Sequence, residues 1–73
     1  MDSTHDRFAA NLRLHRRRLG LSQEALADLC DLHRTEISLL ERRKRSPRLD
    51  TIVNLTRGLQ LSSISELLER TSA

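Results

Sequence analysis

The chain has 73 residues, of which 37% are hydrophobic and 1% aromatic, and a net charge of +3. A chain of this length forms one domain, expected here over residues 1–73, with a modest core that aliphatic side chains must fill. Its one cysteine, Cys30, excludes an internal disulfide, and no segment resembles a secretion signal or a membrane span, so we expect a cytoplasmic protein with no membrane partner.

The composition and the spacing of apolar residues predict an all-α fold of five short helices. Leucine dominates, only two glycines and one proline are present, and β-branched residues are few. The first helix is expected over residues 4–19, where one stripe contains Phe8, Leu12, His15 and Leu19. Gly20 follows as a residue suited to a left-handed helix end.

Two further helices are predicted in the next part of the chain. Ser22 is a suitable N-cap for a helix over residues 23–30, whose inward side is expected to carry Ala25, Leu26 and Leu29. Asp31 tolerates the left-handed conformation of a tight turn. The third helix is expected to begin at His33 or Arg34 and to end at Arg42.

The last two helices follow a basic loop. Pro47 biases Ser46 toward an extended conformation, so segment 43–47 is not helical throughout. A fourth helix is expected over residues 49–59, with its inward side formed by Leu49, Ile52, Leu55, Thr56 and Leu59. A fifth is expected over about residues 63–70, because Ser63 and Glu66 have the spacing of a capping box.

Basic residues are concentrated in the first two-thirds of the chain. Residues 1–48 contain eleven basic and seven acidic side chains, and every basic residue of the chain except Lys44 is arginine. The planar guanidinium group suits phosphate and the edge of guanine better than an ammonium group does. This distribution favours a nucleic-acid-binding surface, although an ordinary solvated surface would have a similar composition.

The third predicted helix has two different sides. Ile37 and Leu40 fall together on one side, and the other side carries Arg34, Thr35, Ser38, Leu39 and Arg42. A helix with such an outer side is suited to the major groove of DNA, which is wide enough to admit one helix. An amphipathic surface helix without a DNA-binding role is the alternative interpretation.

Four segments resemble, in order and spacing, the Cro/C1-type (lambda repressor-like, XRE) helix-turn-helix family. They are 20–27 (GLSQEALA), 34–38 (RTEIS), 40–42 (LER) and 44–47 (KRSP), and the resemblance covers about residues 8–68. It implies a compact five-helix domain with a helix-turn-helix at about residues 22–42. It also implies a bacterial or phage transcriptional regulator that binds an inverted repeat of double-stranded DNA as a homodimer. A short chain with this one domain is similar to the controller proteins of restriction-modification systems.

The resemblance assigns roles to individual residues. Base contacts are implied for Arg34, Thr35 and Leu39, with Ser38 beside them. Phosphate contacts are implied for Ser22, Gln23, Arg42, Arg43, Lys44 and Arg45. A buried ion pair between Arg16 and Glu41 is implied to join the first helix to the recognition helix.

Some positions depart from the family pattern. Arg43 stands where many members have glycine, so a left-handed backbone there would be strained. His15 replaces an apolar residue, Arg48 occupies a helix-capping position, and Gln60 replaces a stop glycine. The expected loop geometry around Arg43 is therefore less defined than the rest of the fold.

No arrangement of side chains indicates catalysis or a bound group. His5, His15, His33 and Cys30 have none of the spacings typical of metal-ligand pairs, and no glycine-rich phosphate loop is present. We therefore expect no enzymatic activity, no metal, no cofactor and no small-molecule ligand. The alternative function is a protein-interaction module or an antitoxin that uses the same fold.

The fifth predicted helix is a candidate dimer interface. Ile64, Leu67 and Leu68 provide more apolar surface than a small core is expected to cover, and Leu14 of the first helix extends this surface. The alternative is that these leucines complete the core of their own chain.

Overall fold

The computed structural model describes residues 3–70, which form five α-helices and no strand. In chain order these are α1 (Thr4–Arg18), α2 (Gln23–Leu29), α3 (Arg34–Glu41), α4 (Leu49–Gly58) and α5 (Ser65–Leu68). The predicted all-α fold with five helices is therefore confirmed. Within this described part of the chain, no helix is long and apolar enough to cross a membrane.

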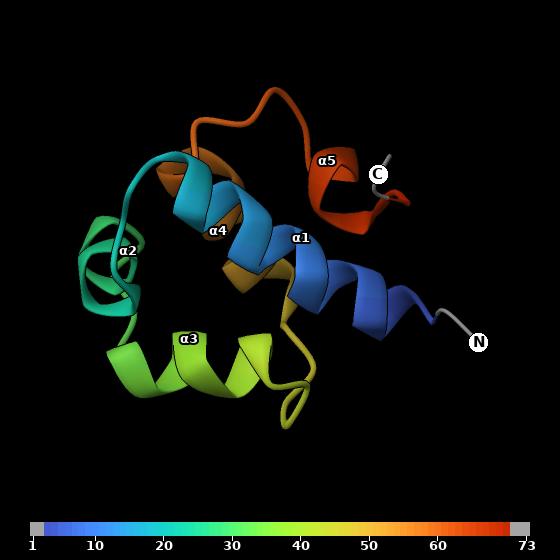
Figure 1. Ribbon diagram of the computed structural model, residues 1–73, viewed down its shortest axis with the longest axis horizontal. Coiled ribbons are helices and arrows are strands. Elements are labelled where there is room, and N and C mark those ends of the chain that lie inside the picture. The colour runs from blue at the N-terminus through green and yellow to red at the C-terminus, as the bar shows by residue number, and fades with distance from the viewer. Residues whose placement is uncertain (1–2, 71–73) are drawn as a thin grey trace.

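The helices are arranged so that α3 lies along one edge of the molecule. In Figure 1, α2 stands at one end of α3, and the loop that follows α3 lies at its other end. Helices α2 and α3 pack against each other, and α1 contacts both α3 and α5. The helix-turn-helix expected at residues 22–42 is thus formed by α2, a short turn and α3.

The core draws on all five helices. Its fully buried apolar side chains are Phe8, Leu12, Leu26, Ile37, Leu40, Leu55 and Leu67. Complete burial of one such side chain stabilises a fold by about 1.5–3 kcal/mol. Because every helix supplies at least one of them, the core fixes the orientation of α3 relative to the other helices.

Local interactions define where the helices begin. At the start of α1, the Ser3 Oγ accepts a hydrogen bond from the Asp6 amide at 3.0 Å, and the Asp6 carboxylate accepts one from the Ser3 amide. This reciprocal pair is a capping box. Ser22 caps α2 as predicted, by accepting a hydrogen bond from the Ala25 amide at 3.0 Å. Arg48 precedes α4 without a side-chain cap.

The first four helices end in the same way. Each is followed, one residue beyond its C-cap, by a residue with a positive φ: Gly20 (68°), Asp31 (57°), Arg43 (60°) and Gln60 (59°). The next amide then donates back to a carbonyl of the last turn, as from Lys44 to Leu39 at 2.9 Å and from Leu61 to Thr56 at 3.0 Å. The left-handed conformations predicted at Gly20 and Asp31 are confirmed.

Three leucines predicted to face inward are exposed instead. Leu29 is 61% exposed at the last residue of α2, Leu49 is 80% exposed at the first residue of α4, and Leu19 is 42% exposed beyond α1. All three lie at a helix end or directly beyond one. Smaller side chains take the inward positions, namely Ala27, Cys30 and Thr51.

The prediction for the last helix was wrong in extent, because α5 is a single turn. The Glu66 carboxylate accepts hydrogen bonds from the amides of Ser62 (2.7 Å) and Ser63 (3.3 Å), as in half of a capping box. The Ser63 hydroxyl does not complete the box, since it pairs with the hydroxyl of Ser65 at 2.6 Å.

Polar side chains of α1 hold the end of α5. Arg7 Nε donates to the Leu68 carbonyl at 3.1 Å, and Asn11 Nδ2 donates to the Glu69 carbonyl at 2.7 Å. His15 Nε2 lies 3.3 Å from the Glu66 carbonyl. These three residues are spaced by four along α1 and therefore form one stripe. This contact accounts for a histidine at a position where the family resemblance implies an apolar residue.

Candidate nucleic-acid interface

Helix α3 has the two sides that its sequence predicted. Ile37 and Leu40 are fully buried, whereas Arg34 and Thr35 are exposed. Ser38 and Leu39 are half-buried, and Arg42 is exposed. The base-reading candidates therefore lie on one accessible side of a helix whose opposite side is anchored in the core.

An ion pair fixes the last residue of α3. Arg16 Nε and Nη2 donate to the two carboxylate oxygens of Glu41 at 2.6 and 3.0 Å, and Arg16 Nη1 donates to the Leu21 carbonyl at 2.8 Å. The Arg16 side chain is 11% exposed and that of Glu41 is 1% exposed. This is the pair implied by the resemblance, in a bidentate geometry that favours strong hydrogen bonding.

Glu41 also holds two other side chains. Gln23 Nε2 donates to Glu41 Oε1 at 3.2 Å, and Arg13 Nε lies 3.5 Å from the same oxygen. Burial alone would raise the pKa of Glu41, but hydrogen bonds from Arg16 and Gln23, with the nearby arginine charges, outweigh burial and hold the pKa below its ordinary value. The carboxylate is thus ionised and links α1, α2 and α3.

The start of α2 lies beside the start of α3. Ser22, Gln23 and Arg34 line one shallow hollow of about 420 Å³, together with Arg16 and Glu24. The structure therefore brings two phosphate-binding candidates next to the leading base-reading candidate. The pairing of Gln23 with Glu41 was not expected from the sequence.

The loop after α3 is tied to α1 and to α3 itself. Arg43 Nη1 donates to Asp6 Oδ1 at 2.9 Å, and this bond is the main reason why the pKa of Asp6 lies below its ordinary value. Arg45 forms an ion pair with Glu36. His5 Nε2 lies 3.0 Å from the Arg45 carbonyl, which can only accept a hydrogen bond.

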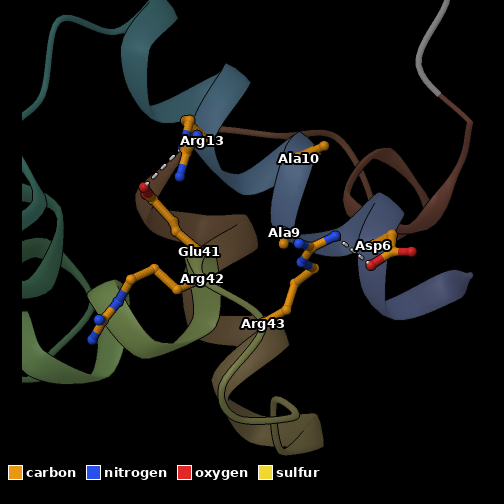
Figure 2. A pocket seen from close by; sticks show the side chains of 7 residues that line it. All are labelled: Asp6, Ala9, Ala10, Arg13, Glu41, Arg42 and Arg43. Carbon is orange, nitrogen blue, oxygen red and sulfur yellow. Dashed lines mark hydrogen bonds and ion pairs between the residues drawn. The ribbon is translucent and has the colours of Figure 1, made fainter.

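Two depressions flank this loop. One, of about 390 Å³, lies between α1 and the end of α3, and Figure 2 shows the seven residues that line it: Asp6, Ala9, Ala10, Arg13, Glu41, Arg42 and Arg43. The other, of about 800 Å³, runs beside α3 and is lined by Asp31, Leu32, His33, Thr35, Glu36, Leu39, Arg45, Arg48 and Thr51. Neither Asp6 nor Glu36 was predicted to contact this loop, because their partners lie in another part of the chain or on a neighbouring loop.

One residue that was predicted to lie in a dimer interface is buried instead. Leu67 is fully buried in the core of its own chain, so it is not available to a second copy. Leu68 and Leu14 are half-buried, and Ile64 is 44% exposed. Two further apolar side chains, Leu49 and Val53, are exposed on α4. The apolar surface is therefore smaller on α5 than expected, and α4 carries a second set of exposed apolar side chains.

Comparisons with known proteins agree with this geometry. The model of the helix-turn-helix family matches residues 12–67. Over 63 residues the chain is 42% identical to the control protein C.SmaI of Serratia marcescens, covering 86% of this chain and 74% of that protein.

Two solved structures are similar in fold and sequence. The restriction-modification controller protein C.AhdI of Aeromonas hydrophila has a TM-score of 0.80 and 38% identity, over 84% of this chain and 91% of that chain. The hypothetical transcription factor NHTF of Neisseria has a TM-score of 0.87 and 34% identity, over 92% of this chain and 76% of that chain. The chain belongs to the helix-turn-helix family of the Cro/C1 (XRE) type, and it is a DNA-binding transcriptional regulator rather than an enzyme.

Proposed function

We propose that the protein binds an inverted-repeat operator as a homodimer, with α3 of each copy in the major groove. The observation that carries this proposal is the exposed side of α3, where Arg34 and Thr35 stand opposite the buried Ile37 and Leu40. Residues at the start of a recognition helix are those that reach base edges in helix-turn-helix complexes. Arg34 is the first residue of α3.

Arg34 is assigned to guanine and its neighbours to adjacent bases. A guanidinium group binds the O6 and N7 atoms of guanine with two hydrogen bonds, which discriminate against other bases by about 1–3 kcal/mol. Thr35 and Ser38 offer hydroxyl groups that suit several base edges. Leu39 has no polar atom in its side chain and is assigned to a thymine methyl group.

Phosphate contacts are assigned on both flanks of α3. Ser22 and Gln23 lie beside Arg34, and the amide group of Gln23 keeps one N–H for a phosphate while the other is held by Glu41. The end of α3 provides Arg42 and the loop provides Arg43, Lys44 and Arg45, all of which are exposed. Such contacts position the protein on DNA but do not read its sequence.

Dimerisation is assigned to apolar side chains of α4 and α5 that are exposed or half-buried. Ile64 and Leu68 remain from the predicted surface of the last helix, while Leu49 and Val53 are four residues apart on α4 and share one side of it. A two-fold dimer places its recognition helices about 34 Å apart on one face of DNA.

The regulatory role is assigned from similarity to control proteins. C.AhdI is a restriction-modification controller, and C.SmaI is a control protein. On this basis we assign the chain to control of a restriction-modification system, acting in the cytoplasm, where the DNA that it regulates lies.

Selection of bound duplexes from a random pool tests the DNA-binding mode. The expected product is an inverted repeat whose half-site centres are about one helical turn apart. Recovery of one unrepeated half-site would contradict the dimeric mode. Binding should weaken steeply between low and moderate salt, because each neutralised phosphate releases counterions. Affinity that does not change with salt would instead favour a protein-interaction module.

Sedimentation at tens of micromolar tests the dimer and its surface. The wild-type chain is expected to sediment as a dimer, and Ile64→Glu and Val53→Glu each place a charge on one of the two candidate surfaces. The variant that becomes monomeric while keeping its helical content identifies the interface. A wild-type chain that is monomeric at this concentration would contradict dimerisation.

A further inference from the structure

Two of the three basic side chains in loop 43–45 are already bound to carboxylates of their own chain. Arg43 pairs with Asp6 of α1 at 2.9 Å, and Arg45 pairs with Glu36 of α3. Within residues 3–70, the Lys44 side chain makes no hydrogen bond or ion pair. The loop that is assigned to DNA phosphates therefore has one immediately available cation and two that must change partner.

Arg43 is directed toward α1. In Figure 2 its guanidinium group lies next to Asp6, beside Ala9, whereas the Arg42 side chain points in another direction along α3. Asp6 is itself held in place by the capping box with Ser3. Arg43 consequently meets a fixed carboxylate at the beginning of α1.

Arg45 is held from two sides. Its guanidinium group reaches back along α3 to Glu36, which is 21% exposed, in the depression that also contains Thr35 and Leu39. Its backbone carbonyl lies 3.0 Å from His5 Nε2. The loop backbone is thus anchored to α1 independently of the two ion pairs, and it keeps this anchor when a carboxylate is neutralised.

We propose that Asp6 and Glu36 lower the affinity for DNA by competing with its phosphates for Arg43 and Arg45. This inference rests on the proposed phosphate-binding role of the loop. A carboxylate and a phosphate use the same guanidinium hydrogen-bond donors, so an arginine that moves to DNA gives up its internal partner. The free energy that each arginine contributes to DNA binding is therefore that of its phosphate contact minus that of the ion pair it gives up. Because phosphates carry no sequence information, the attenuation applies to every DNA sequence.

The expected size of the effect follows from the exposure of the pairs. The four side chains are between 21% and 58% exposed, and ion pairs of this kind are weak. Each carboxylate should therefore reduce DNA affinity by only about twofold to fivefold. Salt screens the ion pairs as well as the phosphate contacts, so the difference should be largest at low salt.

Binding of a non-specific duplex of fixed length, followed by fluorescence anisotropy at low and moderate salt, tests the proposal. The variants are Asp6→Asn and Glu36→Gln, which remove a charge with little change of shape. Asp28→Asn is the matched control, since Asp28 is exposed on α2, the helix that stands at the opposite end of α3 from the loop. It changes the net charge equally and leaves both ion pairs intact.

Asp6→Asn and Glu36→Gln should each bind DNA about twofold to fivefold more tightly than Asp28→Asn at low salt. Binding equal to the control would show that the gain comes from net charge alone and would overturn the proposal. Binding weaker than the control would also overturn it, by showing that the carboxylates orient the arginines for DNA. Measurements well below each variant's melting temperature keep loss of folding from affecting the comparison.

Arginine variants separate this inference from the proposed function. Arg43→Gln should weaken DNA binding and should abolish the gain from Asp6→Asn, because that gain acts through Arg43. Arg45→Gln should do the same for Glu36→Gln. If Arg43→Gln and Arg45→Gln leave binding unchanged, the phosphate role of these arginines fails. If they weaken binding but the carboxylate variants keep their gain, the phosphate role stands and the competition is overturned.

Discussion

Arg16 holds both carboxylate oxygens of Glu41, at 2.6 and 3.0 Å, and so joins the last turn of α1 to the last residue of α3. Both side chains are largely withdrawn from solvent. The pair fixes the end of the recognition helix relative to the core, so loss of DNA binding on substitution of Arg16 would not show that Arg16 contacts DNA.

Glu41→Gln should lower the free energy of unfolding by about 3–5 kcal/mol, because it leaves the guanidinium of Arg16 buried without its counter-charge. Urea unfolding at pH 7 measures this. Arg13→Gln is the control, since Arg13 is half exposed and lies 3.5 Å from Glu41, and its loss should cost less than about 1 kcal/mol. A cost for Glu41→Gln as small as that of Arg13→Gln would contradict a structural role for the pair.

Glu41 also makes the stability of the fold depend on pH. The pKa of Glu41 is lower in the folded chain than its ordinary value of 4.5, so the ionised carboxylate stabilises the fold above that value. This contribution is lost as the pH falls below 4.5 toward the folded pKa. Unfolding free energies measured from pH 7 downward should therefore fall more steeply for the wild-type chain than for Glu41→Gln. Parallel pH profiles for the wild-type chain and Glu41→Gln would contradict this contribution of the Glu41 carboxylate.

Gly58 leaves room for Cys30. A Cβ added at Gly58 would lie 2.4 Å from Cys30 Sγ, a buried thiol whose pKa burial raises. Gly58→Ala should destabilise the fold by about 1–3 kcal/mol despite the better helix propensity of alanine. In a Cys30→Ala background the sulfur is gone, so the same substitution should cost at least about 1 kcal/mol less. Additive effects in urea unfolding would contradict this contact.

Gln60 follows the C-cap of α4 and has a φ of 59°. Gln60→Gly should stabilise the chain by about 1 kcal/mol, because a left-handed conformation is unfavourable for a residue with a Cβ and glycine adopts it freely. Gln60→Ala keeps the Cβ and should give no gain. Asp31→Gly, at a φ of 57°, should gain less, because aspartate tolerates this conformation better than glutamine does. Thermal unfolding compares the three variants, and a larger gain for Gln60→Ala would contradict this explanation.

The sequence predicted most of what local interactions determine. The beginning of α2 followed from Ser22, its end from Asp31, and the two sides of α3 from the spacing of Ile37 and Leu40. Leu29 and Leu49 were misplaced because burial at a helix end depends on which element covers it, and periodicity contains no such information.

The side chains that pair with the loop could not be predicted from the sequence, because their contacts also depend on how the helices pack. Asp6 meets Arg43 only because α1 passes beside the end of α3, and Arg43 adopts a left-handed conformation to follow α3. Leu67 was expected to face a second copy, but α5 turns it into the core. The Arg16–Glu41 pair was anticipated through family resemblance, because spacing alone does not bring residues 16 and 41 together.

In the proposed mode of DNA binding, the exposed start of α3 reads bases through Arg34. The most direct test of this role measures the affinities of the wild-type chain and of Arg34→Ala for the selected operator and for operators with each guanine replaced in turn. The wild-type chain should prefer guanine at one position of each half-site by about 1–3 kcal/mol, and Arg34→Ala should lose the preference at that position alone. Uniformly weaker binding of Arg34→Ala, with every base preference retained, would contradict the claim and assign Arg34 to the phosphate backbone.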